Sequence, residues 1–197
     1  MVAVRDSHLT NPADFDAQTW TASLDLSAVE QAELLQLYRQ LAARETAEST
    51  PLTGSIIGAD NAPLALPLLA YGVEMVEILM TMDMDMDTLK VALLYPFFDA
   101  KLYDQEQIDG LFGAKLTPLL IAVVEMDAIR TLQAKSQTPS ENQMDNLRRM
   151  LMAIVDDVRA IVIKLAERIC HLREVKNASE EERVLARSEE RRVGKEC

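Results

Sequence analysis

Apolar residues recur at intervals of three and four along most of the chain, which is the spacing of an amphipathic helix. With breaks at proline and glycine, this pattern predicts helices over 27–48, 68–80, 104–111 and 116–132. A further helix is predicted from about Thr88, and Pro96 should kink or shorten it. The sequence has no alternating strand pattern, no internal repeat and no low-complexity block. We therefore predict an all-α fold, a multi-helix bundle.

Helix-start signals support this assignment. A side-chain acceptor followed three residues later by glutamate or glutamine is typical of a capping box, in which the two residues satisfy each other's backbone N–H groups. Four stretches fit the pattern: Ser27 with Glu30, Asp104 with Gln107, Thr138-Pro139-Ser140-Glu141, and Ser179 with Glu182. The third is the strongest, because it also places a proline at the first helical position.

The longest predicted helix lies in the C-terminal half. Behind Thr138 the apolar residues step by three or four, which predicts one helix of some 35 residues, about 50 Å long. Its apolar face consists of Leu147, Met150, Leu151, Ile154, Val155, Val158, Ile161, Val162, Leu165 and Ile169. Residues 1–26 show little periodicity, and we interpret them as an arm that lies on the domain through Trp20.

Composition and charge narrow the function classes. The 197 residues include 32 acidic and 20 basic side chains, a net charge of -12, which argues against direct nucleic-acid binding and against attraction to anionic lipid. Two cysteines cannot build a disulfide framework, the N-terminus lacks a leader-like apolar region, and no apolar stretch reaches the roughly 20 residues of a membrane-spanning helix. We therefore expect a cytoplasmic protein that does not contact the membrane.

The alternating run at 82–87 invites a calcium interpretation, because carboxylates at alternate positions open an EF-hand loop. Counted from Asp83, however, the sixth position is Thr88 instead of glycine and the twelfth is Leu94 instead of glutamate. A turn and helix cap explain the run better.

The remaining reactive side chains also have ordinary structural roles. Neither His8 nor His171 has a histidine or cysteine partner at ligand spacing, so we expect His171 to be a partly exposed residue near a helix end. Cys170 is expected to pack as a small apolar residue. We assign the pair Asp156-Asp157 to surface ion pairs with Arg159 and Lys164.

Three segments carry a family resemblance. They are GVEMVEIL at 72–79, DTLKVALL at 87–94 and NLRRMLMAIVDDVRAIVIKLAERICHLREV at 146–175. Together they resemble the N-terminal HD-type hydrolase domain of the RelA/SpoT family of alarmone enzymes, over roughly 71–186, and MVAVR at the start is closest to its RelA branch. The resemblance implies an HD-domain-like bundle over 27–186, with the long helix in its C-terminal half.

Active hydrolases of this family hold one Mn²⁺ with a histidine, a His-Asp pair and a further aspartate. Such donors suit a divalent ion that polarises a phosphate and lowers the pKa of an attacking water. By the resemblance, the first histidine is replaced here by Tyr71, the His-Asp pair by Tyr95 and Pro96, and the last aspartate by Glu167. Three of the four ligands are therefore lost, and we expect no metal.

The other site positions are degenerate as well. The acidic pair that follows the His-Asp motif is reduced to Asp99 beside Ala100. The basic residues that meet the guanine base fall at Ala62 and Pro63, and the nucleotide-contacting asparagine falls at His171. The resemblance thus implies a hydrolase-like domain without catalytic, nucleotide-binding or metal-binding residues, filled instead by aromatic bulk.

Such a domain is implied to scaffold and restrain a neighbouring synthetase domain, which uses Mg²⁺ and ATP to transfer pyrophosphate to the 3′-hydroxyl of GTP or GDP. The resemblance also implies that the parent enzyme associates with the ribosome and uncharged tRNA. We expect the synthetase and C-terminal regulatory domains to be absent, the fragment to be no enzyme by itself, and RSEERRVGKEC at 187–197, which resembles a translated sequencing adapter, to be a non-native tail. The alternatives are a residual Mn²⁺-dependent (p)ppGpp hydrolase and a free-standing helical interaction module.

Overall fold

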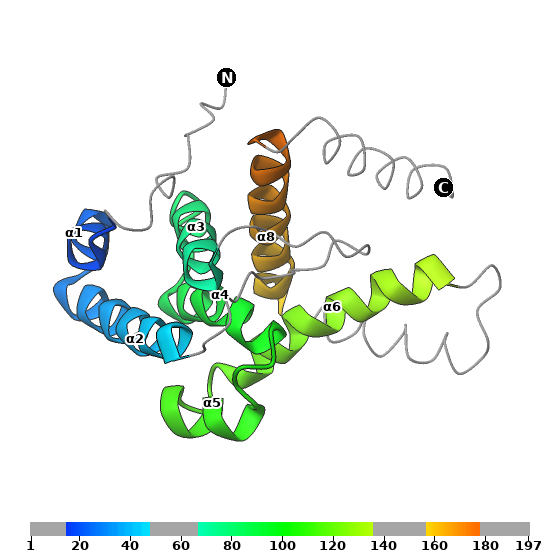
Figure 1. Cartoon of the computed structure of the whole chain (residues 1–197), viewed down its shortest axis with the longest axis horizontal. Helices are drawn as coiled ribbons and strands as arrows, with labels where there is room; N and C mark the ends of the chain where they lie inside the picture. The colour runs from blue at the N-terminus through cyan, green and yellow to red at the C-terminus, as the bar shows by residue number, and fades with distance from the viewer. Residues whose placement is uncertain (1–14, 48–66, 136–156, 178–197) are drawn as a thin grey trace. The chain divides into compact units, whose positions relative to one another are not determined.

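The computed structural model describes residues 15–47, 67–135 and 157–177 (Figure 1). Regular structure in these ranges is helical, which confirms the all-α prediction. The helices are α1 (Ala17–Ser23), α2 (Ala28–Ala47), α3 (Leu68–Met80), α4 (Met86–Asp99), α5 (Gln105–Phe112), α6 (Thr117–Lys135) and α8 (Val158–Asn177). The chain divides into two compact units, 1–121 and 122–197, which are described separately.

The core of the first unit is the contact between α3 and α4, the most extensive between any two of the described helices. Both helices are apolar on nearly all sides, so they are buried nearly all round. Helix α2 packs on both of them and α1 packs on α2. The fully buried side chains of this core include Leu34, Leu41, Leu68, Met75, Leu79, Leu89, Leu93, Leu94 and Phe97.

Gly72 allows α3 and α4 to approach each other closely. A Cβ atom built on Gly72 lies 2.8 Å from the carbonyl oxygen of Leu93 and 3.1 Å from the Leu93 Cα atom. The first distance is shorter than any ordinary carbon-oxygen contact, and both partners are backbone atoms that cannot swing aside. The glycine is therefore required by the packing of the two helices.

The predicted helix starts in this unit are confirmed. Asp104 and Gln107 form a complete capping box at α5, and Ser27 and Glu30 exchange the corresponding hydrogen bonds at α2. Asp85 caps α4 by accepting hydrogen bonds from the backbone N–H and the hydroxyl of Thr88, at 2.8 Å and 2.6 Å. The acidic run at 82–87 is thus a turn and helix cap, as predicted, and not a calcium loop.

Helix α1 lies inside the stretch that we interpreted as an arm. Asp16 caps it, accepting from the backbone N–H groups of Gln18 and Thr19. Trp20 is buried against Phe15 and Tyr38, with ring centroids 5.8 Å and 5.9 Å away. Trp20 therefore anchors this stretch, as predicted. It lies, however, on a short helix that the sequence pattern did not predict.

The long C-terminal helix begins later than predicted. Asp157 is not helical, and α8 starts at Val158. The Asp157 carboxylate accepts a hydrogen bond from the backbone N–H of Arg159 at 3.0 Å, which is how a capping aspartate starts a helix. One uninterrupted helix through this point is therefore wrong, and the expected stretch from Thr138 to Asp156 lies outside the described residues.

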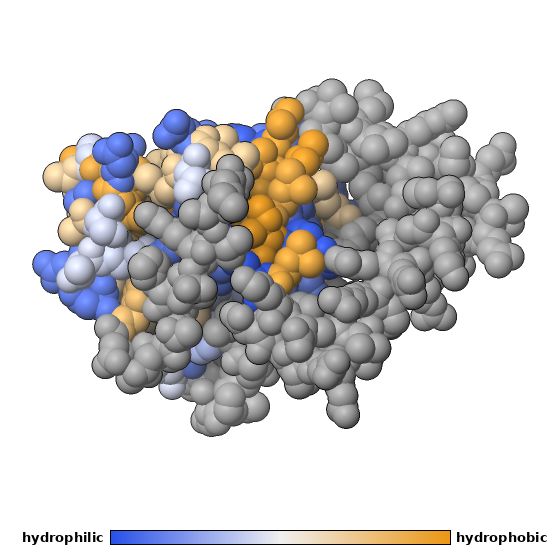
Figure 2. Space-filling view, turned by 90° about the horizontal axis from the view of Figure 1, so that it is seen from above, coloured by the Kyte–Doolittle hydropathy of each residue, from blue (hydrophilic) through white to orange (hydrophobic). Residues whose placement is uncertain are grey.

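Some hydrophobic residues stay on the surface of the described part, beside hydrophilic ones (Figure 2). The large exposed ones are Val29, Met82, Leu111, Val158, Leu165, Ile169 and Leu172. None of the described helices has the length and apolar character to cross a membrane.

We predict that Gly72→Ala lowers the free energy of unfolding by about 1–3 kcal/mol, the usual cost of forcing an extra methyl group into a packed core. Gly110→Ala is the matched control, because a Cβ atom on Gly110 meets nothing within 4 Å and the residue lies inside α5. This control should raise stability by up to about 1 kcal/mol through helix propensity. Urea denaturation measures both changes, and equal effects of the two substitutions contradict the role given to Gly72.

Candidate functional site

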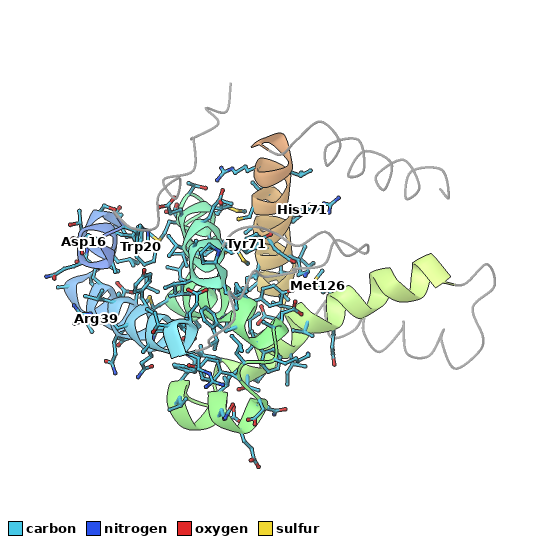
Figure 3. The ribbon with its side chains drawn as sticks, viewed as in Figure 1. Asp16, Trp20, Arg39, Tyr71, Met126 and His171 are labelled. Carbon is cyan, nitrogen blue, oxygen red and sulfur yellow. The ribbon has the colours of Figure 1, made fainter. Side chains whose placement is uncertain are left out.

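Two of the predicted site positions are buried tyrosines on the two central helices. Tyr71, labelled in Figure 3, lies in the first turn of α3, and Tyr95 lies in the last turns of α4. Both side chains are buried. Tyr71 follows the N-cap Pro67, whose carbonyl oxygen accepts its backbone N–H at 3.1 Å. Tyr71 is adjacent to Gly72 in sequence, and Tyr95 is two residues after Leu93. Both tyrosines therefore lie beside the point at which α3 and α4 approach each other most closely.

Pro96, Asp99 and Ala100 form the C-terminal end of α4. A proline gives no N–H to the carbonyl four residues earlier, yet α4 continues through Pro96 and ends three residues later at Asp99. The carbonyl oxygen of Pro96 accepts the N–H of Ala100, the C-cap, at 3.1 Å. Pro96 is buried, Asp99 is partly exposed and Ala100 is exposed.

Arg44 of α2 holds the segment that follows α4. Its guanidinium donates a hydrogen bond to the carbonyl oxygen of Leu102 at 3.2 Å and lies 5.8 Å from the centre of the Tyr103 ring. Burial raises the pKa of Tyr103, and the nearby Arg44 charge opposes that shift. The chain just beyond Asp99 is therefore fixed to α2 by one side chain.

Glu45 of α2 holds the beginning of α3. Its carboxylate accepts the backbone N–H of Leu69 at 3.3 Å, which supplies the acceptor that the N-cap Pro67 cannot. Burial raises the pKa of Glu45, and the hydrogen bonds from Leu69 and Leu68 oppose the shift. No local sequence motif predicts this cap, because donor and acceptor are 24 residues apart.

The remaining described site positions lie on α8, in the second unit. Glu167 is buried and forms an ion pair with Lys164, one turn earlier. His171 lies one turn after Glu167 and is partly exposed, as predicted, and the neighbouring Cys170 is buried, also as predicted. The predicted guanine-contact positions Ala62 and Pro63 lie outside the described residues.

The expected ion pairs of the Asp156-Asp157 stretch are confirmed in part. Asp157 pairs with Arg159, with 2.6 Å between Oδ2 and Nη2. Lys164 forms an ion pair with Glu167, since residues three apart are neighbours on a helix. Asp156 lies outside the described residues.

This donor set does not fit Mn²⁺. Hard divalent ions bind carboxylates and imidazoles, whereas a phenol must lose a proton with an ordinary pKa near 10 and a proline side chain offers no donor. Glu167 is the one carboxylate at a ligand position, and a lysine already neutralises it. In the described ranges no three His, Cys, Asp or Glu side chains are grouped as a metal site requires.

Comparison with known proteins gives consistent matches. The HD domain family matches residues 58–193. The chain is 44% identical over 190 residues to the GTP pyrophosphokinase of Escherichia coli (strain K12), covering 96% of this chain and 24% of that protein. It is 45% identical over 187 residues to the GTP pyrophosphokinase of Haemophilus influenzae, covering 94% and 24%.

A third relative bears a different name. The guanosine-3′,5′-bis(diphosphate) 3′-pyrophosphohydrolase of Vibrio cholerae is 33% identical over 107 residues, which cover 54% of this chain and 14% of that protein. The chain thus spans about a quarter of the length of the GTP pyrophosphokinases that it matches.

We predict that Tyr95→Ala lowers the free energy of unfolding by about 3–5 kcal/mol, as for other buried aromatic side chains. Tyr38→Ala is the control, because Tyr38 is only partly buried, and it should cost distinctly less. Thermal and urea unfolding measure both. A Tyr95→Ala variant as stable as the unsubstituted chain shows that Tyr95 lines an open cleft instead of filling the core.

We also predict opposite pH dependences for two carboxylates. The folded-state pKa of Glu45 is raised, so its stabilising contribution is present when it is protonated and is lost as pH rises through that pKa. Glu45→Gln keeps an acceptor oxygen and should be at least as stable as the unsubstituted chain at pH 7, with the difference shrinking toward about pH 4.

Glu30 is the control for this experiment. Hydrogen bonds from the Ser27 hydroxyl and then the Ser27 backbone lower its pKa, so its contribution is present at neutral pH and is lost as pH falls. Glu30→Gln should therefore be less stable at pH 7. Urea midpoints at the two pH values test both variants, and pH dependences of the same sign rule out the assigned roles.

Proposed function

The chain belongs to the HD domain family and is homologous to the N-terminal region of RelA/SpoT GTP pyrophosphokinases, and we propose that it is a hydrolase-like domain that has lost catalysis. In this proposal the domain scaffolds and restrains a synthetase domain of the same parent chain. The parent transfers pyrophosphate from ATP, with Mg²⁺, to the 3′-hydroxyl of GTP or GDP in the stringent response.

One observation carries the proposed loss of hydrolysis. Tyr71 and Tyr95 occupy two ligand positions of the active family members, and both are buried in the helices that make the tightest contact of the first unit. A solvent-accessible metal site needs exposed donor atoms and room for a phosphate, whereas these side chains fill space in a close-packed interior. Pro96 beside Tyr95 supplies no donor at all.

Polar groups on α2 and, separately, on α8 have structural partners. The Glu45 carboxylate accepts a hydrogen bond from the backbone at the start of α3, and the Arg44 guanidinium donates one to the segment after α4. Lys164 forms an ion pair with Glu167. A carboxylate that acts as a general base has to reach a substrate proton or a water. Glu45 instead caps the start of α3, and Glu167 forms an ion pair within α8, which supports a scaffold.

The parent enzyme's partners follow from the same proposal. Association with the ribosome and uncharged tRNA belongs to other regions of the parent, since an acidic chain of net charge -12 is poorly suited to bind RNA directly.

Reading the genomic DNA beyond the codon for Ala186 tests whether a synthetase domain follows, and a natural stop codon shortly after it argues against this part of the proposal.

We predict that the purified chain does not release pyrophosphate from ppGpp in the presence of Mn²⁺, because the positions that hold the metal carry no usable donor set. A pyrophosphohydrolase of the family with its ligands intact serves as the positive control in the same thin-layer assay. Turnover by this chain that disappears in Glu167→Gln establishes the rival function, a residual Mn²⁺-dependent hydrolase.

A further inference from the structure

Four of the chain's ten methionines lie together at the turn between α3 and α4. They alternate with one threonine and two aspartates. The four are Met80, Met82, Met84 and Met86. The helix cap in this run is formed by Asp85 and Thr88, so capping does not explain why methionine occupies the positions between. We call these four residues the methionine turn.

The methionine turn is accessible to solvent, whereas the methionine inside α3 is not. Met82 is 46% exposed, and Met80, Met84 and Met86 are partly exposed. Met75, earlier on α3, is fully buried. A close-packed interior excludes dissolved reagents, so a small molecule in solution reaches the sulfur atoms of the turn and not that of Met75.

The backbone of the turn is closed by its own hydrogen bonds. The N–H of Met82 donates to the carbonyl oxygen of Leu79 at 3.0 Å, and the N–H of Asp83 donates to that of Met80 at 3.3 Å. Asp83 then takes a left-handed conformation with φ of 51°, which aspartate adopts more readily than most residues. A chemical change at the exposed Met82 side chain therefore leaves the turn intact.

The other three methionines lie where the turn joins the core. Met80 is the last residue of α3 and Met86 is the first residue of α4, and these two helices make the most extensive contact of the first unit. Both side chains are partly buried, as is that of Met84. A strongly polar group on a partly buried side chain loses hydration when it packs, so it destabilises the packed state.

The thioether sulfur is the reactive atom of a methionine side chain. It attacks one oxygen of hydrogen peroxide, so that an S–O bond forms while the O–O bond breaks. The sulfur gives up two electrons and becomes a sulfoxide, and the departing oxygen is reduced to water with the proton of the transferred oxygen. A polar hydrogen-bond acceptor then replaces an apolar side chain, and methionine sulfoxide reductases reverse the change.

We propose that the methionine turn is a site of reversible oxidation by hydrogen peroxide. Met82 reacts first because it is the most exposed of the four, and water solvates its sulfoxide. Oxidation of Met80, Met84 and Met86 follows and weakens the packing of α3 against α4. None of the four is at a predicted site position, so this oxidation does not depend on the proposed loss of hydrolysis.

Peptide mapping of the full chain after graded exposure to hydrogen peroxide tests the order of oxidation. A protease that cleaves after acidic residues separates Met82, Met84 and Met86, because an aspartate lies between each pair. Fragment ions distinguish Met82 from Met80. Met82 should be oxidised first of the four and at least about tenfold faster than Met75. A rate for Met75 equal to that of Met82, or another order within the turn, overturns the proposal.

Thermal unfolding of the oxidised chain tests the effect on packing. Oxidation of all four methionines of the turn should lower the midpoint by about 5 °C or more, whereas oxidation of Met82 alone should leave it unchanged. Treatment with methionine sulfoxide reductases of both stereospecificities should restore the midpoint. A midpoint that full oxidation does not lower, or that the reductases do not restore, overturns the proposal.

Variants assign the change in midpoint to the turn. Leucine is close to methionine in volume, so a variant with all four turn methionines replaced by leucine should fold, and its midpoint should resist peroxide. Met126→Leu is the matched control, because Met126 on α6, labelled in Figure 3, is also partly exposed. This control should retain the full shift.

Met84→Leu with Met86→Leu should reduce the shift in part, which tests the assignment even if the fourfold variant does not fold. A shift that persists undiminished in the double or fourfold variant, or that Met126→Leu abolishes, assigns the effect to methionines outside the turn. Either result overturns the proposal.

Discussion

The first unit depends on how closely α3 and α4 approach each other. Two helices reach this separation only where one of them lacks a side chain, and Gly72 provides that gap against the backbone of Leu93. This close approach limits the volume available to the side chains on either side of Gly72 and Leu93. Tyr71 precedes the glycine and Tyr95 follows the contacted leucine by two residues, and both aromatic side chains are buried in this close-packed interior.

Helix α2 keeps this pair of helices in register from outside. Its last two turns reach both ends of the region, because Arg44 donates to the carbonyl of Leu102 after α4 while Glu45 accepts from the start of α3. Lys90 of α4 also pairs with Glu33 of α2 at 2.5 Å. Arg44 and Glu45 satisfy backbone groups that lack a helical partner, and an apolar side chain in their place leaves those groups without one. The anchoring is thus polar at the helix ends and apolar between them.

Short-range features of the fold were predictable from the sequence, and long-range ones were not. The boundaries of α3, the capping box of α5 and the Asp85 cap follow from residues at most four apart, where spacing and side-chain chemistry carry the information. Helix α1 was missed because seven residues are too few to show a period. The break before Val158 was missed because the apolar steps continue across Asp157, whereas its carboxylate starts a helix there. Glu45 and Gly72 have roles that depend on which helices are neighbours in space.

The interior of the first unit is closely packed, whereas α8 keeps large apolar residues on its surface. An enzyme must keep a cleft open, so its core cannot be packed to full density around the reacting atoms. In this chain Tyr71 and Tyr95 are buried in the first unit, and Lys164 forms an ion pair with Glu167 on α8. Helix α8 has apolar residues on two sides: Cys170 and Ala166 are buried, while Leu165 and Ile169, adjacent to them in sequence, are exposed. The exposed face keeps apolar area in contact with water, and each square ångström of it that another surface covers contributes to the free energy of association.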